Sequence, residues 1–376
     1  MDNKVINQLH MREMNLNEVL KIIREEESLT RRKLQDLTGL SWGGVSQIVT
    51  RLLSQNLIIE VKDTSPGPGR KPTCLQINGE ENLLLGVDIN SSGITAVIQN
   101  LKNEILEQIS IFADCSARKK LLADTFQLTD QIFEKYKERK ILATGISMQG
   151  AVDEKKRVSL YLKECPDWEN VPLCDIFEER YKIPAYLAHD PDCLVASNVS
   201  MFGEDVLLCR IDYGIGLSVF KNGDFIKGPE MLEIGRMLLR TETGKINTLD
   251  QIASIAGIEK NAETPLTELK NTEKGRLLLK EATDALALTI ANSALLFDVS
   301  TILLCGKFLT AEQEIWEELK EELLKFLSKD TRIFRYDEKR AAAGAAWTGL
   351  HGSRICFSDR FHREPERQRQ CRQFDC

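Results

Sequence analysis

The side chains with the clearest chemical pattern lie in residues 41 to 51. Gln47 carries an amide that can form paired hydrogen bonds with an adenine edge, and Arg51 carries a guanidinium that can reach guanine or a phosphate. When the segment is drawn as a helix, both face away from its apolar stripe. The residues on or near the same outward face are Ser41, Trp42, Gly43, Gly44, Ser46, Gln47, Thr50 and Arg51. This set predicts a surface that enters the major groove of double-stranded DNA.

Three helices are predicted to hold this surface. Apolar residues recur at helical spacing from Leu16 to Ile23. A second helix begins after Thr30, a good N-cap, and ends at Gly39. The third begins after Ser41 and buries one apolar stripe, which consists of Val45, Ile48, Val49 and Leu52. Helix, glycine-containing turn and helix together form the helix-turn-helix pattern.

A two-stranded wing is predicted between Leu57 and Ile77, with a turn-rich tip at residues 64–69. Bases outnumber acids seven to three between residues 28 and 75, which gives a local charge of +4 where phosphates would be met. The further candidates for DNA contact are Arg31, Arg32, Arg70 and Lys71. The alternative interpretation is a protein-interaction module with solvated charges. In addition, a Trp at a helix start, such as Trp42, is more often packed than base-reading.

The whole chain has an ordinary globular composition. Its 376 residues are 42% hydrophobic and 28% charged, and the net charge of −7 argues against nonspecific polyanion binding. No apolar run approaches the roughly 20 residues of a membrane span, and the first residues lack the apolar core of a signal peptide. We therefore expect a cytoplasmic protein without membrane contact. The ten cysteines include no CxxC pair, which favours reduced, mostly buried thiols.

From Leu83 onward, strands and helices alternate in two similar sets. The first contains LLLGVDI, ITAVIQNL, EILEQISIF, a helix near 117–137 and ILATGISM; the second contains DVLLCRIDYG, LSVFKNGDFI and helices near 273–297 and 311–328. This order predicts an α/β body. The predicted domains are a winged helix-turn-helix at 1–80, a first lobe at 81–188, a second lobe at 189–329, a return to the first lobe at 330–350 and an Arg-rich disordered tail at 351–376.

Four short motifs follow one another in this body. They are GISMQGAVD at 145–153, AHDPD at 188–192, DYGIG at 212–216 and LEIGRM at 232–237. Over residues 16–350 their order resembles the ROK family of sugar kinases and sugar-responsive repressors. With its N-terminal winged helix the chain is similar to the repressor branch, the xylose and N-acetylglucosamine regulators. The resemblance implies an α/β fold in which a winged helix-turn-helix domain precedes a two-lobed actin-like ATPase body of the ribonuclease H-like, hexokinase type.

The resemblance also assigns residues of the cleft. The implied sugar-binding residues are Gln149, Gly150, His189, Asp190, Glu233 and Arg236. In the family's kinases, the residue that matches Asp190 takes the proton of the attacking sugar hydroxyl. We expect binding without catalysis, so Asp190 is a vestigial catalytic candidate, and it can equally cap the following helix. Arg236 replaces the family's His and can pair with an anionic ligand group or with an acid such as Glu233.

Two cofactor sites depart from the family pattern. The first phosphate loop, at residues 85–93, lacks the Gly-Gly that lets backbone N–H groups approach a phosphate, whereas DYGIG resembles the second. The family's four zinc ligands correspond to Arg236 and to three threonines within residues 241–250. Arg cannot ligate zinc because it stays protonated. We therefore expect no zinc, no bound ATP and no other cofactor.

These observations together predict a sugar-responsive DNA-binding repressor of carbohydrate-utilisation genes that is not an enzyme. Its partners would be a double-stranded DNA operator and a sugar or sugar derivative. Because such proteins read palindromes with two copies, we expect a homodimer or a dimer of dimers. The alternatives are an ATP-dependent sugar kinase of the ROK type and a ligand-blind regulator whose pocket has decayed.

Overall fold

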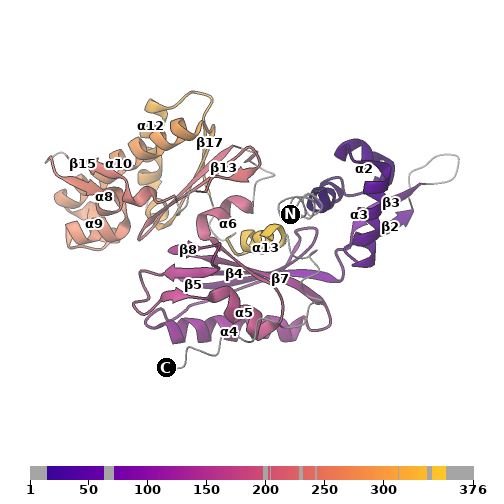
Figure 1. The fold of residues 1–376 in the computed structure, drawn as a ribbon. Coiled ribbons are helices and arrows are strands. Elements are labelled where there is room, and N and C mark those ends of the chain that lie inside the picture. Colours follow the sequence, from indigo (N-terminus) through magenta and orange to yellow (C-terminus); the bar gives the residue numbers. More distant parts are fainter. Residues whose placement is uncertain are drawn as a thin grey trace, which may run out of the picture.

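The chain folds into an N-terminal unit and two lobes (Figure 1). The structure, a computed structural model, describes residues 15–62, 72–197, 202–203, 205–227, 232–241, 244–311, 313–336 and 341–352. For residues 347–352 it describes the backbone only. Arg70, Lys71 and residues 353–376 of the predicted tail lie outside these ranges. Among the described residues, no helix is both long and apolar enough to cross a bilayer.

The N-terminal unit is a helix-turn-helix. Residues 15–25 are helical, followed by α2 (Arg31–Thr38) and α3 (Trp42–Ser54). The side chains of Thr30 and Ser41 cap α2 and α3 by accepting backbone N–H groups, and Gly39 ends α2 with a φ of 66°. Both caps and the glycine stop are therefore as the sequence predicts.

A wing follows these helices. Strands β2 (Ile58–Lys62) and β3 (Thr73–Ile77) pair in antiparallel fashion, and a short strand β1 (Leu29–Thr30), which the sequence pattern did not reveal, pairs with β3. The base of the wing is fastened to the body, because the side-chain amide of Asn82 donates to the carbonyl oxygen of Asn56 at 2.7 Å. The side-chain amide of Asn78 donates to the same oxygen at 3.0 Å, so residues on both sides of the turn at 79–81 are hydrogen-bonded to Asn56.

The first lobe is built on a five-stranded sheet in the order β11-β7-β4-β5-β6. Strands β4, β7 and β11 run parallel, whereas β5 and β6 extend the sheet as antiparallel neighbours. These strands are β4 (Asn82–Asn90), β5 (Gly93–Asn100), β6 (Ile105–Ile111), β7 (Lys140–Met148) and β11 (Ala185–His189). A small sheet of β8 (Ala151–Asp153), β9 (Val158–Tyr161) and β10 (Glu169–Val171) follows β7. Trp168 is buried in this lobe and donates to Ser159 Oγ at 2.8 Å, so its indole packs in the core rather than lining a ligand site.

Helices cover both faces of this sheet (Figure 1). On one face lie α4 (Arg118–Lys135) and α5 (Leu173–Tyr181), and on the other lies the small-residue helix α13 (Ala341–Gly352). A Cβ atom on Gly86 of β4 would lie 1.8 Å from the carbonyl oxygen of Ala342, so glycine permits the close approach of α13. Helix α13 also packs on α6 (Asp190–Ala196), which follows β11. The C-terminal helix thus returns to the first lobe.

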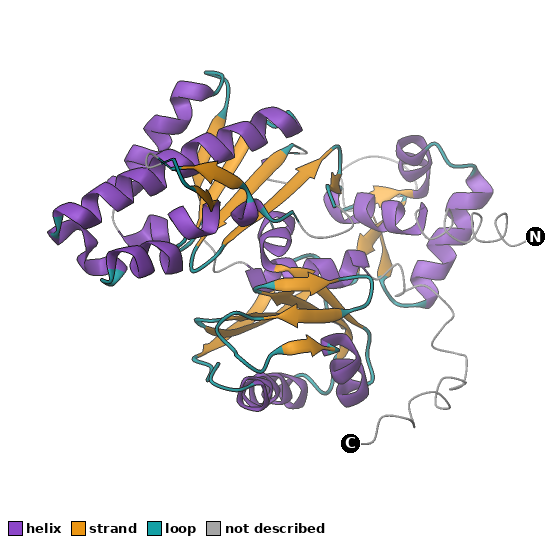
Figure 2. Ribbon diagram, turned by 60° about the vertical axis from the view of Figure 1, so that its left-hand side comes forward, coloured by secondary structure: helices purple, strands orange, loops and turns teal. Residues whose placement is uncertain are grey.

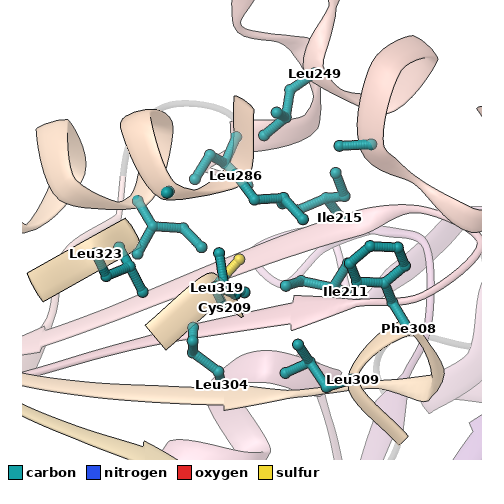
Figure 3. Close-up of a cluster of buried hydrophobic side chains, with 14 of the residues drawn as sticks. Cys209, Ile211, Ile215, Leu249, Leu286, Leu304, Phe308, Leu309, Leu319 and Leu323 are labelled. Carbon is teal, nitrogen blue, oxygen red and sulfur yellow. The ribbon is translucent and has the colours of Figure 1, made fainter. Parts of the chain in front are cut away.

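The second lobe also consists of a sheet with helices packed against it (Figure 2). Its strand order, β14-β13-β12-β17-β18, repeats the plan of the first lobe. The strands are β12 (Val206–Ile211), β13 (Ile215–Lys221), β14 (Asp224–Phe225), β17 (Thr301–Cys305) and β18 (Arg332–Arg335). The helices are α8 (Leu249–Ala253), α9 (Ile255–Ala262), α10 (Glu273–Phe297), α11 (Lys307–Ala311) and α12 (Gln313–Phe326). Cys209 packs among the buried apolar side chains of this lobe (Figure 3), which is the behaviour of a small hydrophobic residue.

One predicted boundary differs from the structure. Strand β18 pairs in parallel with β17, so the sheet of the second lobe continues to Arg335. The boundary predicted at residues 329 and 330 therefore lies before this strand. RIFR gives a weak strand signal because it is only four residues long. The return to the first lobe therefore starts after β18.

Candidate functional site

A cleft between the lobes brings together the six residues proposed for sugar binding. A cavity of about 120 Å³ has Gln149, Gly150, His189, Asp190 and Glu233 in its wall. A neighbouring cavity of about 530 Å³ shares His189 and Glu233 and also contacts Arg236. Gln149 and Gly150 follow β7, His189 ends β11, and Asp190 begins α6. Glu233 directly precedes the short 3-10 helix η1 (Ile234–Arg236), which carries Arg236.

A buried cluster of charges lies in the wall of the smaller cavity. Arg210 of β12 forms an ion pair with Asp190 of α6, and a second guanidinium nitrogen lies 3.5 Å from Asp212 Oδ2. His189 Nε2 lies 3.3 Å from Asp190 Oδ1. None of these four side chains belongs to a residue more than 9% exposed. The carboxylate that would accept a proton in a sugar kinase is therefore already paired with a guanidinium.

Asp88 of β4 lies beside this cluster. Its buried carboxylate accepts hydrogen bonds from Ser147 and, at 2.7 Å, from Asn90 Nδ2. Burial raises the pKa of Asp88, and the nearby Arg210 guanidinium offsets part of this rise. Asp88, Asp190 and Asp212 thus share one guanidinium, and a surplus of carboxylates disfavours a polyphosphate at this place.

The first phosphate loop is occupied by the protein's own side chains. It forms the turn between β4 and β5, where the backbone N–H of Ser91 donates to Gln149 Oε1 at 2.7 Å. The next N–H, from Ser92, donates to Asn90 Oδ1 at 2.8 Å. Backbone N–H groups of this kind would otherwise be available to a phosphate. Gln149 lines the cleft as proposed, but its carbonyl oxygen serves this turn rather than a ligand.

The second phosphate loop lies between β12 and β13 and has a mainly structural explanation. The N–H of Ile215 donates to Asp250 Oδ1 at 2.9 Å, and burial raises the pKa of Asp250. A Cβ atom on Gly216 would lie 2.9 Å from the Cγ atom of Pro191, so glycine permits α6 to pack against β13. The carboxylate of Asp212 also projects into the cavity wall. The spaced glycines therefore serve this turn and the packing of α6.

The ligand-facing side of the cleft includes residues that sequence reasoning missed. Tyr161 at the end of β9 lines both cavities with a side chain that is 49% exposed, and burial of its remainder raises its pKa. Lys227 lines the larger cavity and forms ion pairs with Glu154 and with Asp192, the latter at 3.3 Å. A signal existed for Arg210, since a lone charge in the buried run VLLCRI requires a partner. No sequence feature marks Tyr161 as a cleft residue, because the pattern of its short strand does not show which part of the fold the side chain faces.

The residues proposed for DNA contact lie mainly along the outer face of α3. Trp42, Gly43, Gln47 and Thr50 are exposed, and Gly44, Ser46 and Arg51 are half-buried. Ser41 is exposed and caps α3. On α2, Arg32 is exposed, whereas Arg31 forms an ion pair with Glu60 of β2 at 2.8 Å. An exposed pair of this kind contributes little stability, so Arg31 remains able to exchange Glu60 for a phosphate.

The segment that corresponds to the family's zinc loop forms a hairpin. Strands β15 (Leu238–Arg240) and β16 (Ile246–Thr248) pair in antiparallel fashion. Thr248 caps α8 in a capping box with Gln251. Within the part of the chain that the structure describes, no three His, Cys, Asp or Glu residues are grouped for metal binding. Hydrogen bonds and a helix cap therefore order the end of this hairpin.

Comparison with known proteins agrees with this architecture. The sequence profile of the ROK family matches residues 84–356. The xylose repressor of Caldicellulosiruptor bescii is 24% identical over 259 residues, covering 65% of this chain, and the chain spans 64% of that repressor's length. The DNA-binding transcriptional dual regulator NagC of Escherichia coli is 22% identical over 373 residues, covering 89% of this chain and 92% of NagC.

Solved structures share the fold. The crystal structure of a ROK family transcriptional regulator, a homologue of the E. coli MLC protein, superposes with a TM-score of 0.76 at 17% identity, covering 93% of this chain and all (100%) of that one. A ROK hexokinase from Thermus thermophilus superposes with a TM-score of 0.61 at 19% identity over 72% of this chain and 98% of the hexokinase. The regulator covers a larger share of this chain than the kinase does.

Proposed function

Because the chain belongs to the ROK family, we propose that it is a DNA-binding transcriptional repressor whose affinity for an operator is set by a sugar in the cleft. One observation carries this proposal: an exposed helix-turn-helix is joined to a sugar-kinase-like body whose phosphate-binding positions are filled by the protein's own side chains. The names of the xylose repressors and of NagC support the same function. We propose carbohydrate-utilisation genes as its targets and the cytoplasm as its location.

The cleft is proposed to bind sugar without catalysis. Transfer of a phosphoryl group needs a proton acceptor and a cradle for the nucleotide phosphates. Here Asp190 is paired with Arg210, and Gln149 accepts the Ser91 N–H of the first phosphate loop. Glu233 keeps its position in the wall of both cavities and is proposed to accept hydrogen bonds from sugar hydroxyls. Neither ATP nor zinc is proposed to take part.

The test separates a sugar sensor from a kinase in one set of samples. The purified protein is titrated calorimetrically with neutral and phosphorylated sugars, and ADP formation is followed in the presence of ATP and Mg²⁺. We expect one class of sugar to bind, its affinity to fall in Glu233→Gln, and ADP to stay at the level of the sugar-free reaction. Sugar-dependent ADP release would support the kinase alternative. Absence of binding by any sugar, together with specific DNA binding, would support the ligand-blind regulator.

The proposed DNA partner also implies how many copies of the protein bind together. A single helix-turn-helix covers one half-site, and repressors of this type read two half-sites about one helical turn apart. We therefore propose that two copies bind a palindromic operator as a homodimer or a dimer of dimers. Sedimentation of the protein alone and with operator duplex gives the number of copies, and a stable monomer on a single half-site would contradict this part of the proposal.

A further inference from the structure

We propose that Trp42 recognises thymine in the operator by packing its indole against the 5-methyl group in the major groove, with Gly43 permitting the approach. This inference rests on the proposed function and adds a base preference to it. Trp42 is the first residue of α3, and its side chain is 54% exposed. Among the described residues, no ring contact or hydrogen bond given by the structure holds the indole. A large apolar side chain left uncovered at the end of a recognition helix points to a partner.

Trp42 lies at the exposed N-terminal end of α3, beside the outer side of the helix. Val45, Val49 and Leu52 are buried on the inner side of the helix. Gly43, Gln47 and Thr50 are exposed and recur at helical spacing on the outer side. Trp42 falls one and two turns before Val45 and Val49, at the edge of the buried stripe, and it is exposed because no preceding turn of α3 covers it. It adjoins Gly43 at the N-terminal end of α3, the end from which a recognition helix contacts base edges. Because the thymine methyl is the apolar group that the major groove offers, an indole at this position favours thymine.

Gly43 is a second, independent observation. A Cβ atom built on Gly43 meets nothing within 4 Å, so the fold has room for a side chain there. Its φ is not positive either, and glycine in a helix is less favourable than alanine. Neither packing nor backbone conformation explains this glycine. Close approach of a surface outside the chain does explain it, because a methyl group at Gly43 would project from the same exposed end of α3 as Trp42.

The charges around this end of α3 identify nucleic acid rather than protein as the occupant. Arg32 on α2 is exposed, and Arg51 lies one turn beyond Gln47 on α3. Arg31 is held only by an exposed pair with Glu60. Basic residues that flank an apolar reading surface match phosphates on both sides of a groove. A second copy of this chain on the same surface remains an outcome of the test below.

The experiment starts from duplexes that the full-length protein selects from a random DNA pool at fixed salt. Each thymine in a selected duplex is then replaced by deoxyuridine, which lacks only the 5-methyl group. For the wild-type protein we expect one thymine in each half-site at which this replacement weakens binding about fourfold, the factor for one buried methyl group. In Trp42→Ala the overall affinity falls and the thymine and deoxyuridine duplexes bind equally. Phe112→Ala is the matched control, since Phe112 is 95% exposed but lies in the first lobe.

A glycine variant and its control complete the test. Gly43→Ala is expected to keep or raise the melting temperature and to weaken DNA binding about tenfold or more, through lost contact at the groove. Ser54→Ala, at the exposed last residue of α3 and outside the predicted contact residues, is the control and should bind nearly as the wild type does.

Several results would overturn the inference. Deoxyuridine sensitivity that persists in Trp42→Ala, or wild-type affinity in Gly43→Ala, would contradict thymine recognition while leaving the repressor intact. Loss of the dimer in Trp42→Ala, measured by sedimentation, would instead make this surface a contact between copies. Failure of the wild-type protein to select any duplex would contradict the proposed function itself.

Discussion

At the scale of single residues, Arg210 determines which carboxylates of the cleft are already paired. It is a buried guanidinium that pairs with Asp190 and lies near Asp212 and Asp88. The sequence motif around Asp190 predicted its place in the cleft, but not its partner, because Arg210 lies on a different strand. Gln149 is a similar case, since its bond to Ser91 joins two segments that are 58 residues apart. Local patterns indicate which residues enter a site, whereas long-range pairing decides what remains free for a ligand.

Removal of Arg210 is expected to destabilise the protein strongly. In Arg210→Met the buried carboxylate of Asp190 loses its guanidinium partner and keeps only the contact with His189, and the free energy of unfolding should fall by about 3–5 kcal/mol. Urea unfolding measures this change. The double variant with Asp190→Asn should recover part of the loss, and Arg118→Met, at an exposed position, serves as the control. A loss below about 1 kcal/mol, in the range of a surface pair, would contradict the role given to the cluster.

Asp88 is expected to make the stability of the fold depend on pH. Burial raises its pKa above the unfolded value of about 3.9, so the folded state holds the proton more tightly than the unfolded state does. The stabilising contribution of the protonated form is therefore present below about pH 4 and is lost as the pH rises towards the folded pKa. Relative to Asp88→Asn, the wild type should lose stability as pH increases from about 4. A stability difference between the two proteins that does not change with pH would contradict this assignment.

At the scale of elements, strand β4 connects the cleft to the N-terminal helix-turn-helix unit. Its first residue, Asn82, donates to Asn56 beside the wing, and Asp88 and Asn90 near its other end form the first phosphate turn. Asn82 and Asn90 are about 26 Å apart along the strand. The run LLLGVDI predicted the strand, since buried apolar residues bounded by polar ones are typical of one. It could not predict that Asn82 holds the base of the wing, because a single hydrogen bond to Asn56 produces no periodic pattern in the sequence.

Asn82 is accordingly expected to couple the two units. It is 2% exposed, and Asn82→Ala should lower the free energy of unfolding by about 1–3 kcal/mol through the lost buried hydrogen bond. In the same variant, sugar binding should persist while its effect on DNA affinity decreases. Calorimetry and DNA titration measure the two properties separately, and Asn271→Ala, at an exposed position, is the control. An unchanged sugar effect on DNA affinity would contradict the coupling through β4.

At the scale of the whole molecule, the two lobes enclose the cleft and the helix-turn-helix is attached to the first. Helix α13 packs on the first-lobe sheet and on α6, and α6 contacts β12 and β13 of the second lobe, so these helices connect the second lobe to the sheet that carries β4. A ligand shifts such an equilibrium only if it binds the two arrangements with different affinity. The repeated α/β plan and the winged helix could be predicted from sequence. The charge cluster in the wall of the cleft and the boundary after β18 could not be predicted from sequence. Both depend on pairing between distant strands.

The most direct measurement is the fluorescence anisotropy of a labelled operator duplex, titrated with the protein at fixed salt in the presence of each sugar and sugar phosphate of a panel. We expect specific binding and one sugar class that changes the dissociation constant about fivefold or more. The same sugar should have little effect on Glu233→Gln, whose DNA-binding surface is unaltered. Specific binding with the same dissociation constant in every sugar would contradict regulation of DNA binding by a sugar in the cleft.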